Sequence, residues 1–550
     1  MARNITEVRL LNVPLESDYK HTLYFGSKSA QTEYFKGKTV KYGTDFTYQR
    51  KEKRLRFPAD YDELIGCNYL MYKNSSYSSK WFYAFITKIE YVNDGVSFVY
   101  FETDVIQTWM FDYTVRPSFI EREHVMDDTA GLHTVPEQLE TGDYVINDKN
   151  NNESLQFHGL VIGSTIELND DNDDYKNAQN VAGGYYNGIY SGVKYYEITD
   201  AESMNTILTK LANGAKSDAV TSIFTTPNLF VKATTPSGKK YAEVTKGQSA
   251  VRKDWRNQCV IGQDENGNDV LEWIDRENYK PTHINGHTPR NNKLFTYPYT
   301  YMLMTNNSGG SAVYKYELFN NPDDPNHCAF YIYGTITPGM SIRISPRYYN
   351  GVAINSIEGL NLGKFPICSW ATDVYTNWLT QNSVNIATNL LTGVGQIAGG
   401  VALAGGTGGL GALVGGGSIA NGVGTIANTL TEVYTHSLQP PQAEGNLNSG
   451  DVSFTCKTLT FTAYQMCIKK EFAEIIDGYF DMFGYKVNEV KVPNKNHRKH
   501  WWFTKTIDAN IDGAVPMEDM AKIKACYDNG ITFWKNPANI GNYSLINEII

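Results

Sequence analysis

One stretch of this 550-residue chain carries no charged residue over 58 consecutive positions, between Asp373 and Glu432. It is rich in Gly, Ala, Val, Leu and Ile, and 14 of the 47 glycines lie in it. A transmembrane helix needs about 20 apolar residues, so the stretch is long enough for roughly two spans that turn near residues 405–411. Each glycine costs a helix about 1 kcal/mol relative to alanine in water, whereas in a bilayer only helices or closed barrels satisfy the backbone. We therefore expect a segment that becomes helical only when it meets lipid.

Three other interpretations of this tract stay open. A flexible linker usually carries Ser, Pro or charge rather than Leu, Val and Ile. A pair of buried helices would hold fewer glycines. A permanent membrane anchor usually has Lys or Arg beside it, but neither residue occurs between Lys364 and Lys457. A conditional membrane segment fits this composition better than any of the three.

The tract supplies the predicted functional residues, which are large apolar side chains and the nearest carboxylates. The side chains expected to enter lipid are Leu390, Leu391, Val394, Ile397, Val401, Leu403, Leu410, Leu413, Val414, Ile419, Val423, Ile426 and Leu430. The flanking carboxylates are Asp373, Glu432, Glu444 and Asp451. Ionised carboxylates resist transfer into hydrocarbon, so their protonation is one hypothesis for the trigger of insertion. Mechanical release is the other.

Outside the tract, the composition indicates a soluble and mainly β protein. The chain holds 38 Tyr, 24 Phe and 9 Trp, and aromatic residues favour strands. A net charge of −10 argues against a protein that holds nucleic acid through its phosphates. The seven cysteines are dispersed without a C-x-x-C pair, which indicates neither a disulfide framework nor a zinc ribbon. The N-terminus lacks the apolar region of a signal peptide, so we expect folding in a cytoplasm.

Periodicity divides the chain into five expected segments. These are a β-rich segment at 1–125, a mixed insertion at 126–290, a second β-rich segment at 291–372, the apolar loop at 373–450, and an α/β segment at 451–550. The clearest expected elements are a hairpin of strands 80–91 and 96–102, helices at 470–483 and 517–528, and a strand at 485–492. An amphipathic helix is also expected around 201–212.

Motifs that suggest chemistry have simpler explanations. Residues 393–398 and 422–427 match G-x-G-x-x-A, a dinucleotide-binding pattern, but neither follows a convincing strand. His283 and His287 lie beside Pro and Gly in an expected loop, so a metal site there is disfavoured. Residues 170–174 lack the Gly and Glu of a calcium loop. The basic run 495–500, followed by Trp501 and Trp502, could contact nucleic acid or glycan, although a surface patch at a strand end is favoured. We expect no catalytic residue, cofactor or metal.

Several separated blocks of the sequence resemble a known family. They are SDYK at 17–20, residues 80–91, FETDVIQTWMF at 101–111, FIEREHV at 119–125, GYKVN at 484–488, VKVPN at 490–494 and DNGITFWKNPANIGNY at 528–543. In these blocks the chain resembles the tail knob, or distal tail tube, proteins of the short-tailed picovirus group of phages that infect Gram-positive bacteria. That family also carries a long uncharged Gly-rich loop, followed by the Pro-Pro-Gln found here at 440–442.

The resemblance implies a structural protein of the virion. Its fold would be mainly β with some α (α+β), with β-barrel-like domains that form a tube and a long apolar loop, assembled as a ring of six copies. The loops would block the tube until they enter the host cytoplasmic membrane and form a channel for the viral DNA. Implied partners are further copies of the chain, other tail proteins such as a lower collar or a tail-tip or wall-degrading protein, membrane lipid, and DNA passing without sequence-specific binding.

Three other functions stay open beside this one. A cell-wall-degrading enzyme would need a pair of carboxylates in a cleft. A receptor-binding adhesin could reside in residues 126–290, which match the family poorly. A secreted pore-forming toxin is disfavoured by the missing signal peptide.

Overall fold

The protein divides into two compact units in a computed structural model. Unit 1 comprises Met1–Asp143, Gly286–Tyr299 and Ile468–Ile550, and unit 2 comprises Tyr144–Asn285 and Thr300–Cys467. The chain therefore passes between the units four times. The structure describes residues 6–44, 52–74, 80–151, 158–168, 175–180, 184–186, 189–191, 193–198, 207, 209–211, 213–216, 219–227, 233–234, 241–244, 278–334, 342–350, 359–362, 367–368 and 460–550.

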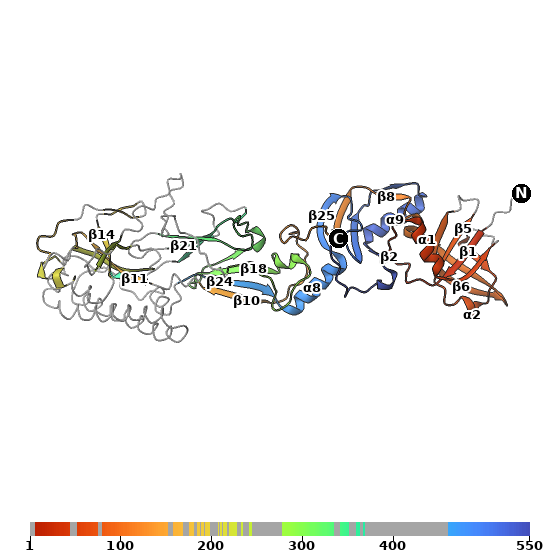
Figure 1. The fold of residues 1–550 in the computed structure, drawn as a ribbon, viewed down its shortest axis with the longest axis horizontal. Coiled ribbons are helices and arrows are strands. Elements are labelled where there is room, and N and C mark those ends of the chain that lie inside the picture. Colours follow the sequence, from red (N-terminus) through yellow and green to blue (C-terminus); the bar gives the residue numbers. More distant parts are fainter. Residues whose placement is uncertain are drawn as a thin grey trace. The chain divides into compact units, whose positions relative to one another are not determined.

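A six-stranded antiparallel sheet forms the first part of unit 1 (Figure 1). Its strands, in spatial order, are β3 (Thr39–Thr44), β1 (Thr6–Leu11), β5 (Tyr69–Asn74), β6 (Trp81–Asn93), β7 (Val96–Thr103) and β4 (Arg54–Phe57). The hairpin expected from the sequence is confirmed, since Asn93 pairs with Val96 across a turn in which Gly95 has φ +73°. A positive φ suits glycine because it has no Cβ.

Both faces of this sheet are buried where β5 and β6 begin, which the sequence did not indicate. Tyr83 and Phe85 pack into one hydrophobic cluster with Phe35, whereas Phe82 and Ala84 pack into another. A strict alternation of apolar and polar residues would have buried one face only. A register shift after Ile86 then ends the regular alternation, and Tyr91 is 56% exposed.

The remaining elements of unit 1 come from both the N-terminal and the C-terminal segments of the chain. A five-stranded sheet has the order β2 (His21–Leu23), β28 (Ile531–Trp534), β26 (Trp501–Ile507), β9 (Ser118–Glu123), β25 (Tyr485–Lys491), with β2 parallel to β28. A ribbon pairs β8 (Tyr113–Val115) with β27 (Ile511–Gly513). The helices are α1 (Lys28–Gly37), α2 (Tyr61–Leu64), α3 (Val105–Trp109), α8 (Lys470–Phe483) and α9 (Met517–Asn529), with short 3-10 turns η5 (Asn292–Phe295) and η7 (Pro537–Asn539).

The two expected C-terminal helices are confirmed in type and extent. Gly484, with φ +65°, ends α8, and its backbone N–H donates to the carbonyl of Phe480. Among the apolar residues of α8, Ile476 and Phe480 are buried, but Ile475 is 69% exposed. The strand expected after this helix is β25.

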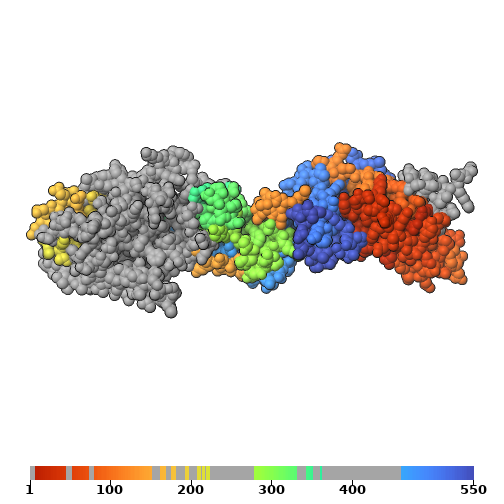
Figure 2. All heavy atoms as spheres, in the orientation of Figure 1, coloured from red at the N-terminus to blue at the C-terminus, as the bar shows by residue number. Residues whose placement is uncertain are grey.

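The N-terminal and C-terminal parts of unit 1 share their cores. Trp501 and Trp534 lie in the cluster with Phe35, and Trp502 and Phe533 lie in the other. Neighbouring residues of β26 and of β28 thus point into different clusters, as the alternation of a strand requires. Figure 2 shows the red N-terminal and blue C-terminal atoms of this unit against each other. We infer that neither part of unit 1 completes its core alone.

The described strands of unit 2 form four sheets. The first is β10 (Tyr144–Asn151), β24 (Thr462–Ile468), β18 (Thr300–Thr305), β19 (Ser311–Tyr314). The second is β16 (Ala233–Thr234), β17 (Tyr241–Val244), β14 (Lys194–Ile198), β11 (His158–Ser164), β15 (Val220–Pro227), β23 (Ile367–Cys368). The others are β20 (Phe330–Gly334), β21 (Ile342–Pro346), β22 (Leu360–Leu362) and the pair β12 (Gly184–Tyr186), β13 (Ile189–Ser191), and a 3-10 turn, η6 (Tyr316–Leu318), follows β19.

The described residues confirm the expected fold class at the level of a mainly β protein with a few helices. Most of the helix expected around 201–212 lies outside the described residues. The five-segment division, the apolar loop and the ring stay predictions. Of the seven cysteines, Cys67, Cys328, Cys467 and Cys526 are described as free and buried.

Candidate functional site

The predicted membrane tract lies between two strands of unit 2. The last described residue before it is Cys368, at the end of β23, and the described chain resumes at Thr460, just before β24. All thirteen apolar residues and the four flanking carboxylates predicted as functional lie outside the described residues, as do both G-x-G-x-x-A motifs. Within the residues that the structure describes, no helix has the length and apolar character to cross a membrane.

The expected loop around the two histidines is confirmed. His287 is bound to a carboxylate, with 2.9 Å between its Nε2 and Oδ2 of Asp477. The backbone carbonyl of His283 accepts a hydrogen bond from Asn147. In the described ranges no three His, Cys, Asp or Glu side chains cluster as metal ligands would. The acidic run 170–174 lies outside those ranges.

The basic and aromatic run near residue 500 is not a stacking surface. Trp501 and Trp502 are 0% and 2% exposed, so neither ring can stack on a base or a sugar. Arg498 is held inside unit 1, where its Nη2 donates to the carbonyl of Val125 at 2.8 Å. For the aromatic part of this run, both the nucleic-acid or glycan interpretation and the favoured surface patch are therefore wrong. The sequence misled because a core strand and an exposed aromatic patch share the same composition.

A buried ionic cluster centres on Glu137, whose side chain is fully buried. Its carboxylate pairs with Arg122 and Lys293 and accepts the backbone N–H of Lys486 at 2.9 Å. Burial lowers the pKa of Lys293, and the nearby Glu137 opposes that shift. Buried charges need such pairing, since an isolated ion in the interior is very costly. The arrangement therefore fixes the conformation of unit 1, and it joins three segments far apart in sequence.

A second group of polar contacts, around Asp477 and Asp481, fastens the internal segment Gly286–Tyr299 to α8. His287 forms one of these contacts, with Asp477. Asn291 forms two more, since its Nδ2 donates to Asp477 Oδ1 at 2.8 Å and to Asp481 Oδ1 at 2.9 Å. Burial raises the pKa of Asp481 to about 6. Sequence reasoning missed this cluster because its partners lie roughly 190 residues apart.

His124 is a neutral imidazole in the core of unit 1. Its Nδ1 accepts the backbone N–H of Phe503 at 2.8 Å, which leaves Nε2 to donate to the carbonyl of Asp481 at 3.0 Å. Burial, reinforced by the positive charge of Arg498, lowers the pKa of His124 to about 3. This histidine therefore acts as a structural bridge between β9, β26 and α8.

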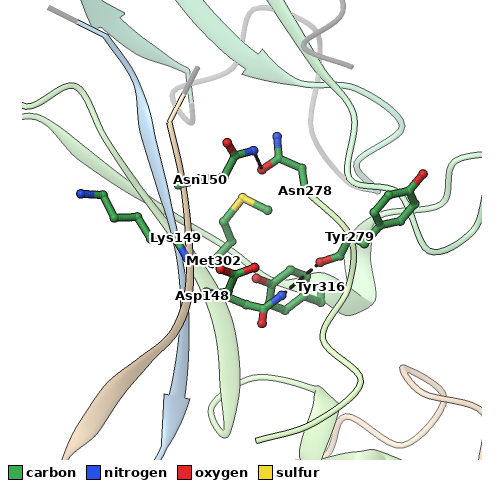
Figure 3. A pocket seen from close by; sticks show the side chains of 9 residues that line it. Asp148, Lys149, Asn150, Asn278, Tyr279, Met302 and Tyr316 are labelled. Carbon is green, nitrogen blue, oxygen red and sulfur yellow. Dashed lines mark hydrogen bonds between the residues drawn. The ribbon is translucent and has the colours of Figure 1, made fainter. Parts of the chain in front are cut away.

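A small hollow in unit 2 is too small for an organic ligand. Its volume is about 10 Å³, roughly the space of one water molecule. Figure 3 shows Asn150 and Asn278 at one side, where Asn150 Nδ2 donates to Asn278 Oδ1 at 3.0 Å. Nδ2 of Asn278 is buried without a protein partner among the described residues. A single bound water fits this geometry.

Comparison with known proteins connects this architecture to phage tails. The family model of the C-terminal domain of tail knob protein gp9 from Bacillus phage phi29 matches residues 264–548. The model of the caudoviral major tail protein N-terminus matches residues 4–114, a range that contains the six-stranded sheet of unit 1.

Similar proteins extend over nearly the whole chain. Tail knob protein gp9 of Bacillus phage phi29 is 28% identical over 607 aligned positions, which cover 99% of this chain and 98% of that protein. The gp9 of Bacillus phage PZA is 28% identical over 604 positions, with the same coverage.

A solved structure with the same fold belongs to the tail knob protein gp12 of bacteriophage C1. It matches 99% of this chain and 100% of its own with a TM-score of 0.64 and 15% identity. The family expected from the sequence is thus confirmed. The chain belongs to the family of the Bacillus phage phi29 tail knob protein gp9.

Proposed function

We propose that this protein is a tail knob subunit that assembles into a hexameric tube for DNA, closed by the apolar tracts until they enter the host membrane. Family membership is the observation that carries the proposal. The major tail protein match over residues 4–114 supports a tube-forming role for unit 1. The names of the relatives denote a structural tail component rather than an enzyme.

The charge of the chain supports a conduit. A strongly basic lumen would retain DNA through many phosphate contacts, and this chain has a net charge of −10. A ring also offers a way to keep the apolar tract out of water, because neighbouring copies can cover one another's exposed patches. Release of the tract at a membrane would then expose it to lipid.

Deletion of residues 385–429 tests this proposal. The flanking strands β23 and β24 lie in sheets with other strands, so the shortened protein should fold and assemble as the full chain does. It should fail to release dye from liposomes, and virions that carry it should attach without delivering DNA. Loss of folding or assembly would show that the tract is part of the core, and full dye release would assign membrane activity to another segment.

The protonation hypothesis has its own test. Dye release from anionic liposomes between pH 4 and pH 8 should rise with acidity if the flanking carboxylates control insertion. The variant Glu432→Gln/Glu444→Gln should then release dye at higher pH than the parent. A flat profile, or an unchanged profile in the variant, would favour mechanical release.

A further inference from the structure

Two rows of side chains cross the outward face of β4, β7 and β6 in unit 1. Residues directly opposite in an antiparallel ladder project from the same face of the sheet. One row is Arg54, Tyr100 and Lys88, and the other is Arg56, Phe98 and Glu90. The inward residues that alternate with them include Leu55, Phe57 and Val99, which belong to a buried core. The rows therefore form one continuous face with two aromatic rings between charged side chains.

Contacts within this face keep the cations over the rings. The guanidinium carbon of Arg54 lies 4.9 Å from the centroid of Phe98, and Nζ of Lys88 lies 5.5 Å from the centroid of Tyr100. The side chains of Arg54 and Lys88 remain 40% and 62% exposed. A cation near an aromatic face is attracted by the ring quadrupole without losing its charge. These groups can therefore still meet an anion from solution.

The charge of the face is weakly positive. The two rows and the neighbouring Glu52 hold three cations and two carboxylates, of which Glu52 pairs with Arg54 at 2.6 Å and Glu90 with Lys88 at 3.3 Å. The next outward carboxylate of β7, Glu102, is paired with Lys522. Exposed ion pairs of this kind contribute little energy, so an incoming anion can replace a carboxylate at low cost.

Another surface of unit 1 is better suited to contact with a second copy of the chain. The centres of protein interfaces are depleted in Lys, Glu and Asp and enriched in Arg and aromatic residues. Unit 1 offers a more apolar surface elsewhere, since Phe119 pairs in register with Val490 and with Ile507. These three side chains are 36%, 70% and 54% exposed.

We infer that the face of Arg54, Arg56, Lys88, Phe98 and Tyr100 is the part of unit 1 that contacts the phosphate backbone of duplex DNA. The inference rests on the proposed conduit and assigns its DNA-facing residues. Each phosphate contact contributes to binding by releasing counterions, and the adjacent carboxylates reduce that attraction. The rings present a surface without hydrogen-bond donors beyond the Tyr100 hydroxyl. Such a face holds DNA weakly, which suits passage rather than retention.

Photo-crosslinking in intact virions tests the inference. Cysteine is introduced by Arg56→Cys, or by Lys88→Cys in a second virion, and labelled with an aryl azide. Lys36→Cys, at an exposed position on α1, is the matched control. DNA release is triggered, the sample is irradiated, and adducts to DNA and to protein are quantified. Parent virions given the same label set the background from the natural cysteines.

The expected result is DNA adducts several-fold above the parent at positions 56 and 88, and background at position 36. Crosslinks from position 56 to a second copy of the chain would overturn the inference and make this face an interface. DNA adducts at position 36 alone would overturn it while leaving the conduit intact. If no position reaches DNA, the inference also fails, and the native mass of the purified protein then decides separately whether the ring exists.

Discussion

Single residues in unit 1 show how charge is accommodated in a core. The carboxylate of Glu137 neutralises two cations, Arg122 and Lys293, that are themselves nearly buried. Breaking a buried ion pair by removing one partner costs about 3–5 kcal/mol, because the remaining charge stays in the interior. Glu137→Gln should therefore lower the free energy of unfolding of unit 1 by about that amount. Chemical denaturation followed by tryptophan fluorescence measures it.

Glu140→Gln is the matched control for this prediction, because Glu140 lies three residues away and is exposed. Exposed substitutions of this kind usually change stability by less than about 0.5 kcal/mol. Equal effects of the two variants would show that the cluster does not stabilise the folded state.

Burial of His124 should make the stability of unit 1 depend on pH in a definite direction. Its pKa is about 3 in the folded protein, below the ordinary 6.5. As the pH falls from 6.5 toward 3, the unfolded chain takes up a proton on this imidazole and the folded chain does not. The free energy of unfolding therefore falls by about 1.4 kcal/mol per pH unit because of this group. Asp481 and Asp104 oppose the trend, because burial raises their pKa values to about 6 and acid therefore favours their folded form.

The contribution of His124 is isolated by comparison with His124→Gln. The variant should be less stable than the parent at pH 7, and the difference should shrink as the pH falls from 6.5 toward 4. Denaturant midpoints at several pH values measure both curves. Parallel curves would mean that His124 does not titrate differently in the folded and unfolded states.

At the scale of elements, the end of α8 depends on a single glycine. A Cβ on Gly484 would lie 2.1 Å from the carbonyl oxygen of Glu123, and its φ of +65° is unfavourable for other residues. Gly484→Ala should therefore destabilise unit 1 by more than about 1 kcal/mol. Gly478→Ala, inside the same helix, meets nothing within 4 Å and should stabilise by about 0.5–1 kcal/mol. Thermal unfolding compares the two, and effects of the same sign would refute this account.

Local elements were predictable where pattern and boundary signals agree. The β6–β7 hairpin has alternating aromatics around Asn-Asp-Gly, and α8 has a helical apolar pattern followed by glycine. The exposure of Ile475 and the burial of Trp501 and Trp502 were not predictable, since they depend on which elements cover each face. The Glu137 cluster was invisible to local patterns, because its cations come from positions 15 residues before and 156 residues after it.

At the scale of the whole molecule, the family and its mainly β fold were predictable because blocks that resemble the family bracket the chain. The division into two units was not, because unit 1 takes in the short internal segment Gly286–Tyr299, which has no distinctive composition. The predicted membrane tract remains a proposal from composition, since its residues lie outside the described structure.

A charge within the tract should separate assembly from membrane activity. Leu413→Arg places a cation near the centre of the tract, at a cost of about 2.5–3.5 kcal/mol for insertion as a helix. Dye release should fall by roughly two orders of magnitude at equal protein concentration, while the oligomeric state stays that of the parent. Leu413→Ala, which adds no charge, is the control. Release by Leu413→Arg at the parental rate would contradict a lipid-spanning tract.

The central claim, a ring built from this chain, is tested most directly by native mass spectrometry of the purified protein. The account predicts particles of six copies of the 61.8 kDa full chain, and particles of six copies of the shorter chain after deletion of residues 385–429. A stable monomer across the concentration range of the experiment would contradict it.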